Sequence, residues 1–348
     1  MNQPRPPVNR VALALVIVSG LALAGLALWK VLYAPRERAI TPAVLGTTSR
    51  LVAVGKGEQL TAALAAAQEE IEQVNRLMST RDPDSVLSRF NDNTDPAVGP
   101  DMLAVVRFGQ SLAQRTGGAF DITVMPLVRL WAKAGQQGAL PIDEELAHAR
   151  ALVGYARLGV PAEGDGPLTK AEPAMQITLD AIAKGYAVDR AIEAMRAVGL
   201  SGAMVEIGGD LRCFGRPADR GRWRIGVQSP WYEGEQLMTI GPTDPAVGLA
   251  VCTSGNYRRF VQIGGKHYSH IIDPRTGAPA DAVPSVTVIA PDAMTADGWA
   301  TALSVLGVEE GLKLVERQDG IEALLVTGTP DAPKYHPSSG FNRYVIAE

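Results

Sequence analysis

The stretch His270-Ile271-Ile272-Asp273-Pro274-Arg275-Thr276-Gly277 carries the most information in this chain of 348 residues. It places an imidazole, a carboxylate and a guanidinium close together, and its proline and Thr-Gly pair exclude one long helix. We therefore expect the end of a strand that turns into a loop, where polar side chains can reach a ligand. Two other unusual stretches, Thr253–Tyr257 and Ala296–Thr301, stand on either side of it. Together the three predict a site for a phosphorylated ligand and a metal.

Helices and strands are mixed along the chain without strict alternation, which favours an α+β fold over a doubly wound sheet. The clearest helix, at 61–79, repeats apolar residues at helical spacing. These residues are Leu64, Ala67, Ile71, Val74 and Met78. Further helices are expected at 101–116, 143–155, 183–198, 292–306 and 308–318, and a turn at 79–88. Strands are expected at 46–54, 203–207, 223–228, 247–252, 258–268 (with a hairpin turn at Gly264-Gly265), 285–290 and 321–327.

Residues 11–33 form an apolar segment interrupted by Ser19 and Lys30. At about 1.5 Å per residue, its part 11–29 spans roughly 28 Å, which is close to a bilayer core. A signal peptide cleaved near Ala22-Leu23-Ala24 is the alternative, but the apolar run continues to Leu28, which favours an uncleaved transmembrane anchor. The predicted organisation is a tail at 1–10, an anchor or signal segment at 11–33, a linker at 34–43 and one domain at 44–348. We expect the inner membrane as the location, with the domain facing the periplasm or cell exterior.

The net charge of −4 argues against nucleic acid as a partner, and no basic run is interleaved with aromatic residues. Cys213 and Cys252 are too few for a disulfide scaffold and lack metal-ligand spacing. Two separate buried thiols are favoured, and a disulfide in an oxidising compartment stays open.

Asp297 and Thr301 stand four positions apart on a predicted helix, so both project from one face. A carboxylate with a hydroxyl suits Mg²⁺, although a polar helix face with an aspartate near its N-terminus would look the same. Gly208-Gly209-Asp210 follows a strand and would suit either phosphate binding or a tight turn.

Other polar residues also carry two interpretations. His270, with Asp273 nearby, is either structural or an oriented general base. Lys184 begins a helix, where it would meet an anion or solvent. The Phe120-Asp121 pair is either part of a ligand site or a core ring beside a helix-starting aspartate.

Seven short stretches follow one another in an order typical of a known family. They are Met78-Ser79-Thr80 with Asp84-Ser85 and Ser88–Asn91; Gly118–Asp121 with Pro126-Leu127 and Leu130-Trp131; Ile182–Asp189; Gly208–Asp210; Thr253–Gly255; His270–Gly277; and Val286–Ala290 with Ala296-Asp297 and Thr301. Together they resemble the ApbE family, the FAD:protein FMN transferases. The resemblance spans nearly all of the predicted domain and implies an ApbE-like α+β fold with mixed or antiparallel sheets and flanking helices.

The resemblance also implies an activity and a site. Members of this family are exported, bind FAD and Mg²⁺, and transfer FMN to a threonine or serine hydroxyl of a partner protein, with release of AMP. By this resemblance His270 is the catalytic base, and the metal is held by Asp297, Thr301 and the carbonyl of Ala181. The positions that bind the flavin nucleotide are Leu45, Ala119, Phe120, Asp121, Lys184 and Ile271. The implied partner is a membrane-associated or exported redox protein.

Some positions depart from the family pattern. Leu45 replaces the usual methionine of the first strand, and Arg81 replaces an aromatic residue that contacts flavin. Thr178 and Ala300 stand where acidic residues occur in relatives, so the metal site is expected to be poorer in charge. Two other activities therefore stay open: an FAD pyrophosphatase that uses water as its nucleophile, and a non-catalytic flavin-binding assembly factor.

Overall fold

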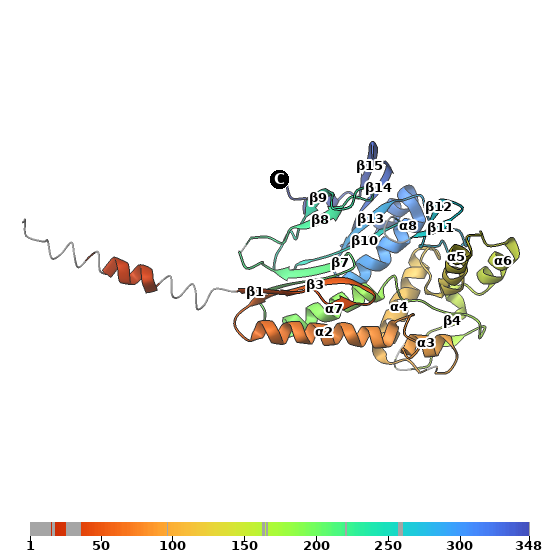
Figure 1. Ribbon diagram of the computed structural model, residues 1–348, viewed down its shortest axis with the longest axis horizontal. Helices are drawn as coiled ribbons and strands as arrows, with labels where there is room; N and C mark the ends of the chain where they lie inside the picture. Colours follow the sequence, from red (N-terminus) through yellow and green to blue (C-terminus); the bar gives the residue numbers. More distant parts are fainter. Residues whose placement is uncertain are drawn as a thin grey trace, which may run out of the picture.

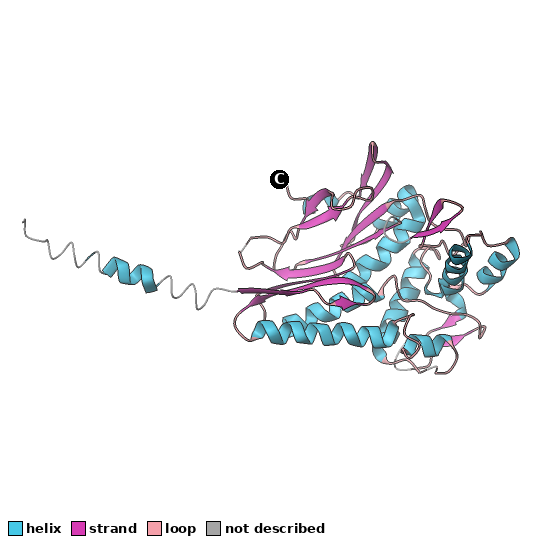
Figure 2. Cartoon of the chain, viewed as in Figure 1, coloured by secondary structure: helices cyan, strands magenta, loops and turns pink. Residues whose placement is uncertain are grey.

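An antiparallel sheet of nine strands lies at the centre of the computed structural model, which describes residues 15, 18–25, 36–95, 97–161, 164, 166–219, 221–256 and 260–347. The strand order is β1-β3-β6-β7-β10-β13-β14-β15, and β2 pairs with β3. Figure 2 shows the strands in magenta and the helices in cyan. The strands are β1 (Arg36–Ile40), β2 (Ala43–Val44), β3 (Thr47–Gly55), β6 (Gly202–Ile207), β7 (Asp210–Gly215), β10 (Leu249–Gly255), β13 (Ser285–Ala290), β14 (Glu322–Thr329) and β15 (Ala332–Pro337).

Three helices cover one face of this sheet: α2 (Gln59–Met78), α7 (Ala183–Ala197) and α8 (Ala293–Val315) (Figure 1). Because side chains alternate along a strand, Leu51 and Ala53 of β3 enter the core under the helices. Val52 and Val54 enter a second core on the other face. That face is covered by β8 (Ile225–Gln228), β9 (Gln236–Ile240) and η3 (Phe341–Tyr344).

A group of shorter elements lies beside the helical layer, on the right in Figure 1. Within it, α5 packs against α6 and β11. Its helices are α3 (Val86–Asn91), α4 (Pro100–Arg115), η1 (Ile122–Val124), α5 (Met125–Gln137), α6 (Asp143–Ala151) and η2 (Tyr155–Arg157). Its strands are β4 (Leu158–Gly159), β5 (Thr169–Lys170), β11 (Phe260–Ile263) and β12 (Lys266–Ser269).

The predicted α+β class and antiparallel sheet are confirmed. All five residues of the predicted apolar stripe on α2 are buried. The two helices predicted at 292–306 and 308–318 are joined as α8, which is interrupted at Gly307, where φ is 78°. A left-handed residue breaks helical hydrogen bonding, so the prediction of two segments describes the backbone well.

Two helices are absent from the prediction. The predicted turn at 79–88 contains the start of α3, which Ser85 caps by accepting a hydrogen bond from the Ser88 amide at 3.0 Å. The other is α5, whose Pro126 lies in its first turn. Proline is tolerated there because the missing N–H would have no partner within the helix.

The N-terminal predictions are described only in part. Residues 36–40, expected in a linker, instead form β1, which pairs with β3 at the edge of the sheet. Three charged side chains are exposed on this edge strand, those of Arg36, Glu37 and Arg38. Such a charged sequence is also typical of a linker, so the strand was not predicted. Of the predicted anchor at 11–33, only Leu15 and residues 18–25 are described, and the rest lies outside the described residues. In the part of the chain that the structure describes, no helix has the length and apolar character needed to span a membrane.

The two cysteines are free and buried. They lie on neighbouring strands, but Cys252 packs in the core under the helices, whereas Cys213 packs in the core on the opposite face of the sheet. Because their side chains point to opposite faces, a disulfide would require the strands to rearrange.

Candidate functional site

A cavity of about 470 Å³ opens between the helical layer and the group of shorter elements. His270, Asp297 and Thr301, which are distant in sequence, all line it. Six further predicted site residues line the same cavity: Ala119, Phe120, Asp121, Ala181, Lys184 and Ile271. The three stretches singled out in the sequence therefore meet at one place.

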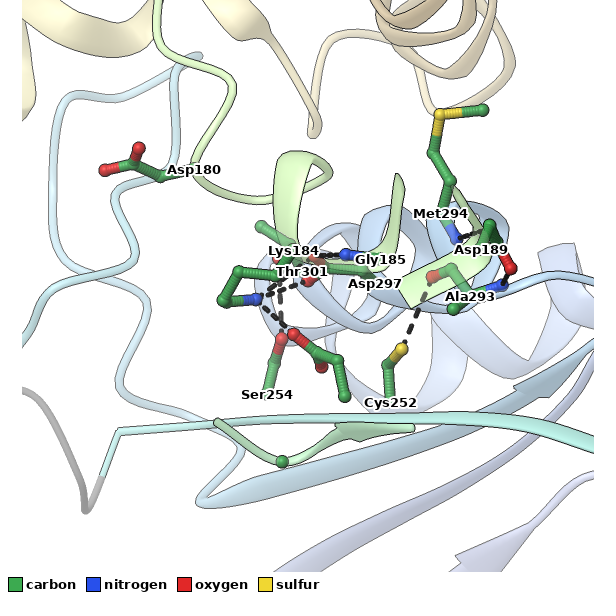
Figure 3. A network of polar contacts seen from close by, with 12 residues as sticks. Asp180, Lys184, Gly185, Asp189, Cys252, Ser254, Ala293, Met294, Asp297 and Thr301 are labelled. Carbon is green, nitrogen blue, oxygen red and sulfur yellow. Dashed lines mark hydrogen bonds and ion pairs between the residues drawn. The ribbon is translucent and has the colours of Figure 1, made fainter. Parts of the chain in front are cut away.

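Three charged side chains form a cluster, and two of them, Lys184 and Asp297, line this cavity (Figure 3). The Lys184 ammonium, at the start of α7, donates to Asp210 of β7 and to both carboxylate oxygens of Asp297 on α8, at 3.2 and 3.1 Å. Both carboxylates are almost fully buried, and the Lys184 side chain is 22% exposed. We call these three residues the lysine cluster.

The electrostatics of the lysine cluster follow from burial and from its unequal charges. Burial acts to lower the pKa of Lys184, but the two carboxylates outweigh it and raise that pKa, so the ammonium stays charged. Burial, together with the nearby Asp210 carboxylate, raises the pKa of Asp297 above its ordinary value. Two carboxylates around one ammonium leave one negative charge in excess when both are ionised, which favours the arrival of a further cation.

Glycines bring the elements of this cluster close together. A Cβ on Gly185 would collide with the Ala293 carbonyl, so only glycine lets α7 approach the start of α8 this closely. The Gly185 amide then donates to Asp297 Oδ2 at 3.2 Å. The turn at Gly208-Gly209 has positive φ at both residues and leads directly into Asp210.

The oxygen donors near Asp297 fit a hard cation. Thr301 lies one turn further along α8, and its hydroxyl lies 3.4 Å from that of Ser254 on β10. A carboxylate with hydroxyls is the donor type that Mg²⁺ accepts, with water or phosphate oxygens completing its shell. Among the described residues, no group of three or more His, Cys, Asp or Glu side chains could hold a metal.

The loop that begins at His270 is anchored at its far end. Trp131 of α5 donates to the Gly277 carbonyl at 2.8 Å, and Arg150 of α6 donates to the Arg275 carbonyl at 2.8 Å. Asp273 accepts two hydrogen bonds from the Arg275 guanidinium, each at 3.0 Å, so the arginine holds its carboxylate. His270 follows β12 directly and is exposed at the cavity.

Phe120 and Asp121 serve the fold as well as the cavity wall. Phe120 is buried in the core under the helices. Asp121 caps η1, accepting from the Thr123 amide and hydroxyl at 2.8 and 2.7 Å and from the Tyr155 amide at 2.8 Å. Burial raises the pKa of this carboxyl, although its hydrogen bonds act to lower it. The interpretation as a core ring beside a helix-starting aspartate is confirmed, and both residues also line the cavity.

Leu45 lies outside the main cavity and lines a second one of about 300 Å³. The two cavities share Gly46, Asp180 and Lys184 in their walls. Arg81 lines the second cavity, and its guanidinium lies against Gly46 where a Cβ would otherwise be. A planar guanidinium at this position offers a stacking surface.

The comparisons with known proteins agree with this geometry. Residues 45–325 match the ApbE family. The chain belongs to the ApbE family. The predicted membership is confirmed, and with it the prediction of a transferase.

Several ApbE relatives cover most of the chain. It is 40% identical over 282 residues to the FAD:protein FMN transferase of Vibrio cholerae, covering 79% of this chain and 82% of that protein. It is 34% identical over 314 residues to the protein of that name from Haemophilus influenzae, covering 86% and 89%. The solved flavin transferase ApbE from Vibrio cholerae superposes with a TM-score of 0.77 at 35% identity, covering 89% of this chain and 99% of that one. The ApbE protein of Thermotoga maritima superposes with a TM-score of 0.80 at 30% identity, covering 90% and 100%.

The sequence left some residues of this ApbE site unassigned. Asp210 was noted only with its glycine turn, and its contact with Lys184 joins residues 26 positions apart. Ala300, which stands at the position of the expected second acidic residue, is buried in the core. The second carboxylate near Asp297 is instead that of Asp210. A carboxylate straight after a two-glycine turn was the available signal.

Proposed function

We propose that this protein is an FAD:protein FMN transferase, which attaches FMN from FAD to a threonine or serine hydroxyl of a partner redox protein in a Mg²⁺-dependent reaction that releases AMP. The names of its relatives support the transferase and its substrate FAD. The single observation that carries the proposal is the cavity in which His270 from the loop meets Asp297 and Thr301 from α8.

The proposed step joins an acceptor oxygen to the flavin-side phosphorus of FAD. The new P–O bond replaces the P–O bond to AMP, which leaves with the bridging oxygen. His270 takes the proton of the attacking hydroxyl, a role suited to an imidazole near neutral pH. Its exposure at the cavity lets a hydroxyl on another protein reach it.

The remaining residues act by position and charge. Asp297, Thr301 and the Ala181 carbonyl would hold Mg²⁺, which would neutralise the pyrophosphate and stabilise charge on the departing AMP. Lys184, which the resemblance assigns to FAD binding, lines the same cavity and helps to hold the Asp297 carboxylate in position. Catalysis of this kind rests mainly on positioning and electrostatic stabilisation.

Incubation of the purified protein with FAD, Mg²⁺ and a candidate acceptor tests this proposal. We expect a fluorescent flavin band on the acceptor after denaturing electrophoresis, and an FMN mass increment on one of its threonine or serine residues. Release of free FMN and AMP without an acceptor would identify a pyrophosphatase instead. Stoichiometric retention of FAD with no turnover would identify a flavin-binding assembly factor.

The location and the partner are proposed from the sequence. Residues 11–33 support an anchor in the inner membrane, with the domain facing the periplasm or cell exterior. An acceptor at the same membrane or in the same compartment would then be a membrane-associated or exported redox protein. Fractionation of cells that express the full chain tests the membrane location. Protease treatment of spheroplasts then tests which side of the membrane the domain faces.

A further inference from the structure

Asp210 is a buried carboxylate that is not one of the predicted metal ligands. It is 2% exposed and follows the glycine turn at the start of β7. Its described ion pair is with the Lys184 ammonium. A buried carboxylate is costly unless it is paired and hydrogen-bonded, so the effect of Asp210 on the site acts through its partner Lys184.

The distances within the lysine cluster indicate this effect. Lys184 is shared between two carboxylates, and Asp210 is the nearer of them. Its contacts with the two oxygens of Asp297, at 3.2 and 3.1 Å, are longer than the about 2.7–2.9 Å usual for a charge-assisted bond. Asp210 therefore draws the ammonium away from Asp297.

The charge count has a second consequence. With Asp210 present, the three groups carry one excess negative charge when ionised. Without it, Lys184 and Asp297 would neutralise each other and form a closed pair. A neutral pair would attract a divalent cation much less than a cluster with a free negative charge.

We propose that Asp210 is a positioning residue for the cation site: by binding Lys184, it keeps the Asp297 carboxylate able to receive a divalent cation. This inference rests on the proposed Mg²⁺-dependent function. It names a residue that acts on the cation site through Lys184. Asp210 itself touches neither substrate nor metal in this role.

Direct binding of Mn²⁺ to the full-length protein, measured by electron paramagnetic resonance without FAD, tests the inference. We expect Asp210→Asn to weaken Mn²⁺ binding on the order of 10- to 100-fold, as loss of an outer partner of a metal ligand commonly does. The matched control is Glu322→Gln, which removes another mostly buried carboxylate, paired with Arg343 at 2.9 Å and outside the cavity. We expect this control to bind Mn²⁺ as the wild type does.

The double variant Asp210→Asn/Lys184→Met separates positioning from a merely structural role. It restores the excess charge on Asp297, so we expect Mn²⁺ affinity to return to within a few-fold of wild type. Affinity that stays as weak as in the single variant would overturn the inference, as would wild-type affinity in Asp210→Asn. If Asp210→Asn does not fold, Mn²⁺ binding by the Lys184→Met variant alone tests the inference. We expect this variant to bind Mn²⁺ at least as tightly as the wild type, and weaker binding would overturn the inference.

FAD binding, followed in parallel by flavin fluorescence without metal, separates this inference from the proposed function. A wild-type protein that binds neither FAD nor Mn²⁺ would remove the proposed function and the inference together. A wild-type protein that binds both, beside an Asp210→Asn variant with unchanged Mn²⁺ affinity, would remove the inference alone.

Discussion

Helix α7 carries two largely buried charged clusters that differ in their surroundings. The lysine cluster at its start has two carboxylates for one ammonium, and its Lys184 and Asp297 line the cavity. Further along, Asp189 pairs with Arg212 at 2.9 Å and accepts the Ala293 and Met294 amides, each at 2.9 Å. This second group, which we call the arginine cluster, lies outside the walls of the cavity.

The difference indicates what each cluster does. In the arginine cluster both carboxylate oxygens of Asp189 have partners, and the cluster joins α7, β7 and the start of α8, so its role is to hold the fold. The lysine cluster has two almost fully buried carboxylates and places one of them, Asp297, in the wall of a cavity, which suits a site that awaits a cation. Changes at the cavity should therefore affect chemistry, and changes at the arginine cluster should affect stability.

The largest expected effect comes from His270→Ala. Loss of a general base typically lowers the rate about 10²- to 10⁴-fold, and we expect this loss in FMN transfer with FAD affinity and unfolding unchanged. The matched control is His267→Ala, since His267 lies on β12, stacks on Phe260 and does not line the cavity. Equal transfer rates in the two variants would remove His270 as the base.

Asp189→Ala should break the arginine cluster. Although burial of the carboxylate is itself unfavourable, its removal leaves Arg212 and two backbone amides without their partner. Breaking a buried pair in this way costs about 3–5 kcal/mol, which chemical denaturation measures. Glu193→Ala is the control, because it removes an exposed partner of the same arginine and should cost about 1 kcal/mol or less. The comparison of the clusters would fail if Asp189→Ala kept wild-type stability and lost activity per folded molecule.

The pH dependence of stability should distinguish the wild type from Asp189→Asn. Burial raises the pKa of Asp189 from 3.8 to about 6, so the folded state binds more protons than the unfolded state between these values. The free energy of unfolding should therefore fall as pH rises through this window, on the order of 2–3 kcal/mol at about 1.4 kcal/mol per unit. Asp189→Asn lacks this contribution. Denaturation curves at pH 4 and pH 6.5 that fall in parallel for both proteins would contradict the prediction.

The smallest effect is expected at the two thiols. Burial raises the pKa of Cys213 to about 12 and that of Cys252 well above its ordinary value, so both stay protonated and unreactive. Iodoacetamide should label neither cysteine in the folded protein and both in denaturant, with equal mobility on reducing and non-reducing gels. Faster labelling of Cys252 in the native state would show that solvent reaches the lysine cluster through the cavity.

Local pattern made much of this fold and site predictable. The apolar stripe of α2 predicted its buried face correctly, because that face depends on helical periodicity alone. Asp297 and Thr301 were paired for the same reason, and the structure places both in one cavity. Edge strand β1 and helix α5 were missed, because exposed charges and an early proline resemble features of loops.

The amino-acid sequence alone determined the family, the α+β class and most of the residues that meet at the cavity, since short motifs and periodicity carry that information. Only the tertiary structure decided that Lys184 sits between Asp210 and Asp297, and that the cysteines face opposite cores. These outcomes depend on contacts between segments distant along the chain. Burial and charge balance arise when such segments pack, and local sequence preferences do not specify them.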